Sequence, residues 1–315
     1  MGIKVRTEEE YEDLLGQWAD LESALNISLN HPMQVAQFAQ RIAQYDKWML
    51  ALLEHDPDLG LYLLFQVASN STVGYSASHA LMCAVLCHFV AKDCNLPDPE
   101  RDALVRAALT MNLGMTQLQD VLALQKSPPD EQQRAGIHDH PRKSVEMLQK
   151  VGVSDELLLQ TIALHHRQDK TDQPLTELSG AERLSFVLQV VDRYAARISP
   201  RQSRAGLDSM ASIDSGMSSD QAIASQVSQS LMRAVGSSPP GTLVRLDDGS
   251  TAMVRNRGSG NNQPDVVIVL ESDGQRSRPF RLHRTASEQA QIQQAITSSG
   301  LLERLSHHQI LRVAY

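Results

Sequence analysis

The chain has 315 residues, of which 42% are hydrophobic, 21% are charged and 4% are aromatic, as is ordinary for a folded soluble protein. A net charge of −8, with no basic stripe to follow a phosphate backbone, argues against a protein that binds DNA or RNA. The N-terminus turns acidic at once, unlike a signal peptide, and the longest apolar run, from Ala80 to Ala91, is too short to cross a bilayer. We therefore expect a soluble, cytoplasmic protein that binds neither nucleic acid nor membranes.

The N-terminal residues predict two helices. Thr7 followed by Glu10 is typical of a capping box and begins a first helix that ends at about Leu25. Pro32 is well placed as the first residue of a second helix that ends at about Glu54. These helices form an extension that precedes the rest of the chain.

The second helix carries a narrow apolar seam in which spacings of three and four alternate, as in a coiled coil. The seam consists of Val35, Phe38, Ile42, Tyr45, Met49 and Leu52. It lasts for fewer than three heptads, which leaves two interpretations open. The seam packs against the rest of the chain, or it forms a homodimer through residues 35–52.

A helix that is apolar nearly all round is expected over residues 76–94, which predicts the buried centre of a helical bundle. Further helices are expected at about 98–112, 139–151, 154–166 and 179–198. A polar loop rich in turn residues is expected at 124–133. The last of these helices begins with a capping box formed by Ser179 and Glu182. Beyond it, residues 205–219 are rich in Ser, Gly and Asp and predict a loop.

Near residue 240 the apolar period changes from that of a helix to that of a strand. TLVRL and STAMVRN, joined by Asp247-Asp248-Gly249, predict a hairpin, and VVIVL and RPFRL add two strands. We expect a small antiparallel sheet over 240–285 and a helix at about 286–305. The predicted fold is therefore mainly α, a helical bundle with an N-terminal helical extension and a small C-terminal antiparallel β subdomain. The predicted boundaries are 1–69 for the extension, 70–210 for the bundle, 211–239 for a linker with a short helix, and 240–315 for the β subdomain.

The predicted sheet is locally basic within an acidic chain. Its arginines are Arg245, Arg255, Arg257, Arg276, Arg278, Arg281 and Arg284. They predict either a solvated face or a docking surface for an acidic partner.

Several of the eleven histidines lie where a metal site could form. The candidate ligands, which lie on or beside several predicted helices, are His79, His138, His140, His165, His166 and Asp192. Imidazole and carboxylate groups hold divalent metals for hydrolysis, and separate rigid helices fix their angles. Each of these residues alone is also compatible with an ordinary core or surface position. Cys83 and Cys87 share a helix face with His79; we expect small buried thiols, with a metal cluster as the alternative.

In order and context these residues resemble the HD-GYP family, the metal-dependent cyclic di-GMP phosphodiesterases of the HD phosphohydrolase group, over about residues 70–210. The resemblance is carried by the segments YSASHALMCAVLCHFVA, AGIHDHPRKSVEML, ALHHRQD and VVDRYAARISPRQSR. It implies an HD-type helical bundle whose metal ligands are His79, His140, His165, His166 and Asp192. It also places Arg201 and Arg204 on basic residues of the loop that follows. They are candidate contacts to a ligand phosphate, and a solvated loop is the alternative.

The same resemblance reveals departures at the catalytic centre. In AALTMNLGM, Met111 and Asn112 replace the family's His-Asp pair. Met115 replaces its lysine, and Gly114 remains. Arg167 replaces a glutamate after the paired histidines, and the Gly-Tyr-Pro signature is absent. A bimetal hydrolytic site needs an anionic bridge that shares a hydroxide between two cations, and neither a thioether nor a neutral amide supplies one, so we expect a damaged centre.

By analogy with the family, the surviving ligands divide between two metal positions. The ligands of one position would be His140, His165 and His166. They would hold one zinc, iron or manganese ion with an open coordination position, whereas His79 and Asp192 would be a two-ligand remnant of the other position. His138 or Asp139 would be the nearest substitute for a missing ligand. A site without metal is the alternative.

Three functions stay open, and with them the question of whether the chain is an enzyme. The leading hypothesis is a degenerate binding or scaffold module in bacterial cyclic-dinucleotide signalling. It would engage a signalling protein or a cyclic dinucleotide through the cleft of the damaged catalytic centre. The alternative is an active metal-dependent phosphodiesterase or phosphatase with a reduced, mononuclear centre. The third is an interaction module without metal or nucleotide.

Overall fold

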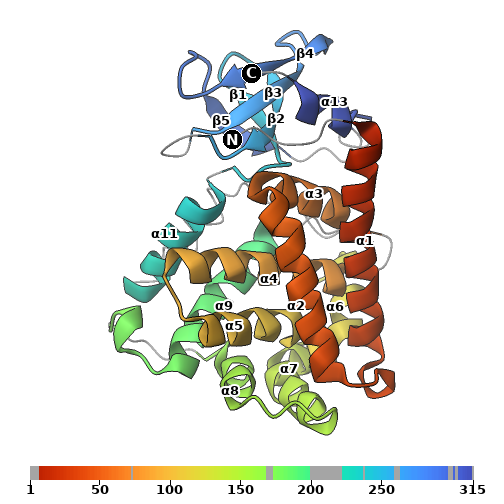
Figure 1. Ribbon diagram of the computed structural model, residues 1–315, viewed down its shortest axis with the longest axis vertical. Coiled ribbons are helices and arrows are strands. Elements are labelled where there is room, and N and C mark those ends of the chain that lie inside the picture. The colour runs from red at the N-terminus through yellow and green to blue at the C-terminus, as the bar shows by residue number, and fades with distance from the viewer. Residues whose placement is uncertain are drawn as a thin grey trace.

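The computed structural model describes most of the chain as a helical bundle with a small sheet at one end (Figure 1). The described residues are 7–71, 74–167, 173–198, 222–236, 238–258, 263–296, 301 and 304–313. Within them the chain is mainly α-helical, and the sheet is antiparallel and five-stranded. A mainly α fold with a C-terminal β part is therefore confirmed. None of the described helices is both long and apolar enough to span a membrane.

The N-terminal part consists of the helices α1 (Glu8–Asn30), α2 (Phe38–His55) and α3 (Pro57–Asn70). The predicted cap of α1 is confirmed, because the Thr7 hydroxyl oxygen accepts a hydrogen bond from the Glu10 backbone N–H at 3.0 Å. The second helix begins at Phe38 and not at Pro32. Pro32 begins only a 3₁₀ turn, η1 (Pro32–Gln34), and Gln37 has a φ of 54°, a left-handed conformation that interrupts a continuous helix.

The apolar seam of the second predicted helix packs against other parts of the same chain. Its buried side chains are Phe38, Ile42, Tyr45, Met49 and Leu52. The Tyr45 hydroxyl lies 2.9 Å from the Ser28 hydroxyl of α1, which joins the two helices. The intramolecular interpretation is therefore confirmed. The structure does not support a homodimer through residues 35–52, because the side chains that would form it are already covered.

Helix α4 (Tyr75–Asp93) lies at the centre of the bundle, as predicted for residues 76–94. Every residue from Ser76 to Cys87 is buried. Helix α4 contacts α1, α3, α5 (Asp98–Thr110), α9 (Gly180–Ile198) and α11 (Ala222–Val235) (Figure 1). A helix with apolar side chains on every face needs neighbours on every face, which explains this central position.

The segment between α5 and α8 differs from the prediction. It contains a 3₁₀ turn, η2 (Leu113–Met115), and a helix that the sequence did not predict, α6 (Thr116–Leu124). Helix α7 (Glu131–Lys150) begins well before the predicted start at 139, because Asp130 and Gln133 form a capping box. Pro141 therefore lies inside α7 and not in its first turn.

The remaining helices of the bundle lie where the sequence predicts them. Helix α8 (Glu156–Leu164) is followed by a 3₁₀ turn, η3 (Leu175–Glu177), and then by α9. The predicted capping box of α9 is confirmed. The Ser179 Oγ accepts from the Glu182 N–H at 3.4 Å, and the Glu182 carboxylate accepts from the Ser179 backbone N–H at 3.3 Å.

The sheet has the strand order β4-β3-β2-β1-β5. Its strands are β1 (Leu243–Leu246), β2 (Thr251–Asn256), β3 (Asp265–Leu270), β4 (Arg276–Arg284) and β5 (Ile292–Ile296). The first four confirm the predicted hairpin and the two strands after it. The helix predicted at 286–305 is wrong over 286–296, because β5 pairs with β1, and a later helix, α13, covers His307–Arg312. Pairing with an open strand edge overrides the helix propensity of a segment rich in Gln and Ala.

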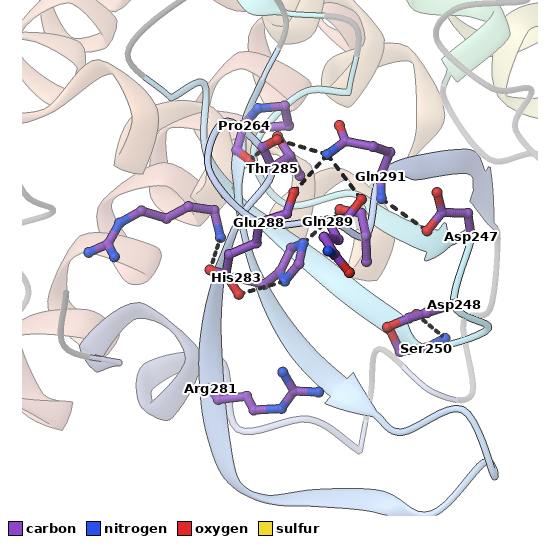
Figure 2. A network of polar contacts seen from close by, with 12 residues as sticks. Asp247, Asp248, Ser250, Pro264, Arg281, His283, Thr285, Glu288, Gln289 and Gln291 are labelled. Atoms are coloured by element: carbon purple, nitrogen blue, oxygen red, sulfur yellow. Dashed lines mark hydrogen bonds and ion pairs between the residues drawn. The ribbon is translucent and has the colours of Figure 1, made fainter.

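The connection from β4 to β5 crosses the sheet from one edge to the other, and Figure 2 shows the polar contacts that hold it. The Gln291 side-chain nitrogen donates to the carbonyl oxygens of Thr285 at 2.9 Å and Glu288 at 3.0 Å. The Gln291 backbone N–H donates to Asp247 Oδ1 in the β1–β2 turn at 3.1 Å. These contacts fix an irregular segment so that β5 reaches the free edge of β1.

The sheet and the helical bundle share one apolar core. One face of the sheet contributes Leu243 and Met253 to the core that the helices form. Tyr62 of α3 is also fully buried, and its hydroxyl lies 2.7 Å from His307 Nδ1 in α13. The C-terminal part is therefore distinct from the bundle in secondary structure but is packed together with it.

Candidate metal centre

Three histidines come together at the junction of α7 and α8. His140 lies within α7, and His165 and His166 follow the last residue of α8. One ring nitrogen of each histidine lies within 4.8 Å of those of the other two. The Nε2 atoms of His140 and His165 are 3.3 Å apart. The structure thus brings together three residues that the sequence analysis singled out as ligands of one metal.

Pro141 explains how His140 is oriented. In a regular helix the backbone N–H of residue 141 would donate to the Ile137 carbonyl oxygen, but proline has no N–H. His140 Nδ1 takes its place and donates to the Ile137 oxygen at 2.5 Å. This hydrogen bond fixes the Nδ1–H tautomer and leaves Nε2 bare towards the other histidines.

The end of α8 orients His165 in the same way. His165 Nδ1 donates to the carbonyl oxygen of Ile162 at 2.6 Å. Carbonyl groups in the last turn of a helix lack intrahelical partners, so this oxygen is available to a side chain. His165 Nε2 is therefore also bare and faces Nε2 of His140.

Both of these rings are fully buried and uncharged at neutral pH. Burial lowers the pKa of His140 to about 4 and that of His165 to about 3. Two bare nitrogens at 3.3 Å cannot hydrogen-bond to each other, and their lone pairs repel unless a cation lies between them. Two nitrogens that each lie ~2.05 Å from a tetrahedral zinc ion are about 3.3 Å apart. The donor set and its spacing therefore fit one divalent metal ion.

His166 is the solvent-facing member of this three-histidine group. Its side chain is exposed, and its ring centroid lies 4.1 Å from that of His165 and 5.0 Å from that of His140. Neighbouring atoms still shield part of the ring from water, which lowers its pKa. The group is therefore closed on the side of His140 and His165 and open to solvent at His166.

A second group of donors lies between α4 and α9. His79 Nε2 is 2.8 Å from Asp192 Oδ1 and 3.5 Å from Cys83 Sγ. On the other side of the same ring, Nδ1 lies 3.3 Å from the Tyr75 hydroxyl oxygen. One donor atom each of His79, Cys83 and Asp192 lies within 4.8 Å of the other two. The family resemblance pairs His79 with Asp192. For Cys83 the sequence favours a buried thiol and leaves a metal cluster with His79 as the alternative.

Asp192 is ionised and lies within electrostatic range of both groups. Burial acts to raise its pKa, but the hydrogen bond with His79 and the neighbouring histidines hold the pKa below its usual value. Its charge also acts to raise the pKa of all three histidines at the α7–α8 junction. A fixed negative charge beside these neutral rings favours a cation over an anion.

The segment at Met111 and Asn112, where the sequence resemblance predicts a lost His-Asp pair, is packed as part of the core. Met111 is fully buried, and Asn112 is 8% exposed. The Ser144 hydroxyl of α7 donates to the Met111 carbonyl oxygen at 2.7 Å and accepts from the Gly114 N–H at 2.9 Å. These bonds hold η2 against the helix that carries His140. Neither Met111 nor Asn112 is charged, so these two positions supply no anionic bridge.

The predicted substitutes for the missing ligands lie elsewhere. His138 and Asp139 line a groove of about 950 Å³, together with Met115. The Asp139 carboxylate accepts hydrogen bonds from Arg142 at 2.8 Å and 2.6 Å. The structure therefore places neither residue among the ligands of the three-histidine group.

The predicted cationic contacts are only partly described. Arg201 and Arg204 lie outside the described residues. Of the arginines of the sheet, Arg255 is 3% exposed, and Arg257 and Arg281 form ion pairs with acidic side chains. One of these arginines is buried and two are paired with acids, so the sheet presents a smaller basic face than the sequence indicates.

Comparisons with known proteins add no assignment. No family model matches the sequence, and no curated protein or solved structure is significantly similar to it. The resemblance to the HD-GYP family therefore rests on the motifs in the sequence.

Proposed function

We propose that this chain is a cytoplasmic signalling protein that keeps one metal site of an HD-GYP-like centre and has lost hydrolysis. It acts as a binding or scaffold module in bacterial cyclic-dinucleotide signalling, where it engages a partner protein or a cyclic dinucleotide. The order of the ligand motifs along the chain supports the family. The geometry at the α7–α8 junction supports the retained metal.

One observation carries the metal site: the bare Nε2 atoms of His140 and His165 face each other at 3.3 Å in a fully buried position. Each ring is held through Nδ1 by a backbone carbonyl, an arrangement that is common among metal-binding histidines. Without a cation, two desolvated acceptors would lie opposite each other, which is costly. His140, His165 and His166 would hold zinc, iron or manganese, which would supply a Lewis acid.

The neutral segment at Met111 and Asn112 supports the loss of hydrolysis. A hydroxide shared between two cations needs an anionic ligand that joins them. Both of these side chains are buried and uncharged, and an amide oxygen is a poor substitute for a bridging carboxylate. Any cleavage of a phosphodiester would then depend on a single cation in the three-histidine group.

A mononuclear phosphodiesterase is the second candidate, and the exposure of His166 favours it. Three histidines that hold zinc and leave a fourth position to water are a known catalytic arrangement. The chain would then cleave a cyclic dinucleotide or a related phosphodiester slowly, on the solvent-facing side of the group.

Metal content and turnover separate these functions. The purified full chain is analysed for bound zinc, iron and manganese and is then assayed with cyclic di-GMP and a generic phosphodiester, with manganese or iron added. An equivalent of metal that His165→Ala removes, without turnover in the wild type, supports the degenerate binder. Turnover that His165→Ala abolishes supports the enzyme. A metal content that His165→Ala does not change would overturn the three-histidine site.

Calorimetry with cyclic di-GMP tests the nucleotide part of the proposal. We expect Arg201→Ala to leave the circular dichroism spectrum unchanged and to weaken binding, because a guanidinium group pairs with phosphate through two hydrogen bonds. An unchanged affinity would remove Arg201 from the site. A wild type that does not bind the dinucleotide would leave a protein partner as the ligand.

A further inference from the structure

Cys83 brings a thiol to a place where the family resemblance implies only His79 and Asp192. We propose that these three side chains form a second, separate metal site, in which the Cys83 thiolate is the third ligand and which takes zinc in preference to hard cations. This site goes beyond the proposed function and does not depend on the three-histidine group.

The spacing of the donors fits zinc. His79 and Cys83 are four residues apart on α4 and share one face of the helix, a spacing that recurs in helical zinc sites. A nitrogen and a thiolate sulfur that bind one tetrahedral zinc are roughly 3.6 Å apart, and the observed distance from His79 Nε2 to Cys83 Sγ is 3.5 Å. The contact between His79 Nε2 and Asp192 Oδ1 is a hydrogen bond of 2.8 Å, and it opens by roughly 0.5 Å when both atoms bind one zinc.

Charge balance also favours a thiolate at this site. Cys83 is fully buried and His79 is 1% exposed, so a net charge here is costly. A thiolate and a carboxylate together neutralise one divalent cation, and the imidazole adds no charge. Cys83 on α4 supplies the second negative charge beside that of Asp192 on α9.

The protons of the three ligands balance simply. The Cys83 thiol gives its proton to solvent when the metal binds. The neutral ring of His79 changes tautomer, so that its proton moves from Nε2 to Nδ1. The Tyr75 hydroxyl oxygen lies 3.3 Å from Nδ1 and accepts a hydrogen bond from it. No group is oxidised or reduced. Thiolate is a soft ligand, so zinc and cobalt bind here better than magnesium or manganese.

Cobalt(II) tests the site, because a cysteine thiolate bound to cobalt gives a charge-transfer band in the near ultraviolet that histidine and carboxylate ligands do not give. The full chain is freed of metal with a chelator and titrated with cobalt. We expect a band that saturates within about two equivalents, because the three-histidine group also takes up cobalt, that zinc removes and that excess manganese leaves in place. A wild type without this band overturns the proposal, and displacement by manganese overturns the zinc preference.

Variants assign the band to one thiol. The described cysteines are Cys83, Cys87 and Cys94. Cys83→Ser should abolish the band, whereas the double variant Cys87→Ser/Cys94→Ser, which keeps Cys83 as the single thiol of the chain, should retain it. Loss of the band in the double variant overturns the assignment even if Cys83→Ser does not fold.

His165→Ala separates this site from the three-histidine group. We expect His165→Ala to keep the thiolate band and to bind one equivalent of metal less than the wild type. Loss of the band in His165→Ala would show that the two groups are one site. A full metal content with the band intact would count against the three-histidine group and leave the thiolate site supported.

Discussion

Gly114 lies so close to His140 that a Cβ atom at position 114 would be 2.8 Å from the His140 carbonyl oxygen. The same atom would lie 2.6 Å from Cβ of Lys143 and 2.8 Å from the backbone nitrogen of Ser144. Any side chain at position 114 therefore pushes η2 away from α7, which carries a ligand of the three-histidine group. This close approach gives a physical reason for a glycine at position 114.

We expect Gly114→Ala to lower the free energy of unfolding by about 1–3 kcal/mol, because the added methyl group overpacks the contact between η2 and α7. Metal binding should weaken as well, since His140 moves with α7. Urea denaturation and a zinc titration measure the two effects. Gly16→Ala is the matched control, because no atom lies within 4 Å of its added Cβ and alanine favours a helix. A Gly114→Ala protein as stable as the wild type would contradict the close approach.

Pro141→Ala should weaken zinc binding by about tenfold. Alanine restores a backbone N–H at position 141, which donates to the Ile137 carbonyl oxygen and competes with His140 Nδ1 for it. Calorimetric titration with zinc measures the change. Pro57→Ala, in the first turn of α3, serves as the control and should leave the affinity unchanged. The same affinity in Pro141→Ala and the wild type would mean that another contact orients His140.

His88 on α4 makes part of the stability depend on pH. Burial, followed by the charges of Arg101 and Lys92, lowers its pKa in the folded chain from 6.5 to about 4. The unfolded chain binds more protons between these values, so this contribution is fully present above about pH 6.5 and is lost as the pH falls towards 4. Arg101 Nε donates to His88 Nδ1 at 3.1 Å, and asparagine offers an acceptor in its place. In His88→Asn the loss of unfolding free energy over this range should be about 1–2 kcal/mol smaller. Denaturation of the metal-free proteins at several pH values decides this, and identical profiles would refute it.

Gln291→Ala should lower the free energy of unfolding by about 1–2 kcal/mol. The carbonyl oxygens of Thr285 and Glu288 lose the donor that holds the connection between β4 and β5. Hydrogen exchange should show faster opening of β5, and chemical denaturation gives the free energy. Gln293→Ala, at an exposed position of β5, is the control and should change little. If both variants behave alike, the Gln291 amide does not hold the connection.

Local signals were enough to predict most of the fold. The apolar run at 76–94 predicts α4 because a helix without a polar face can lie only in the interior. The Ser179 cap and the hairpin at Asp247 depend on residues within a few positions of each other, so the sequence shows them directly. The order of the motifs predicts that the three histidines at the α7–α8 junction belong together, and the structure brings them within 4.8 Å of one another.

Other features depend on contacts that no local pattern contains. Pro141 favours the first turn of a helix, yet it lies inside α7, where the His140 ring uses the carbonyl group that proline leaves free. Strand β5 has a helix-like composition and is a strand because the edge of β1 is open to it. The spacing of Cys83 from His79 leaves a core thiol and a metal ligand both open, and only the packing of α9 brings Asp192 beside the His79 ring.

The contact between Tyr62 and His307 joins residues that are 245 positions apart in the chain. During synthesis, α3 leaves the ribosome long before the strands and the helix that cover it exist. Until those elements exist, the side of α3 that they cover has no partner from them. We therefore expect α3 to complete its packing only after β2 and α13 have been made.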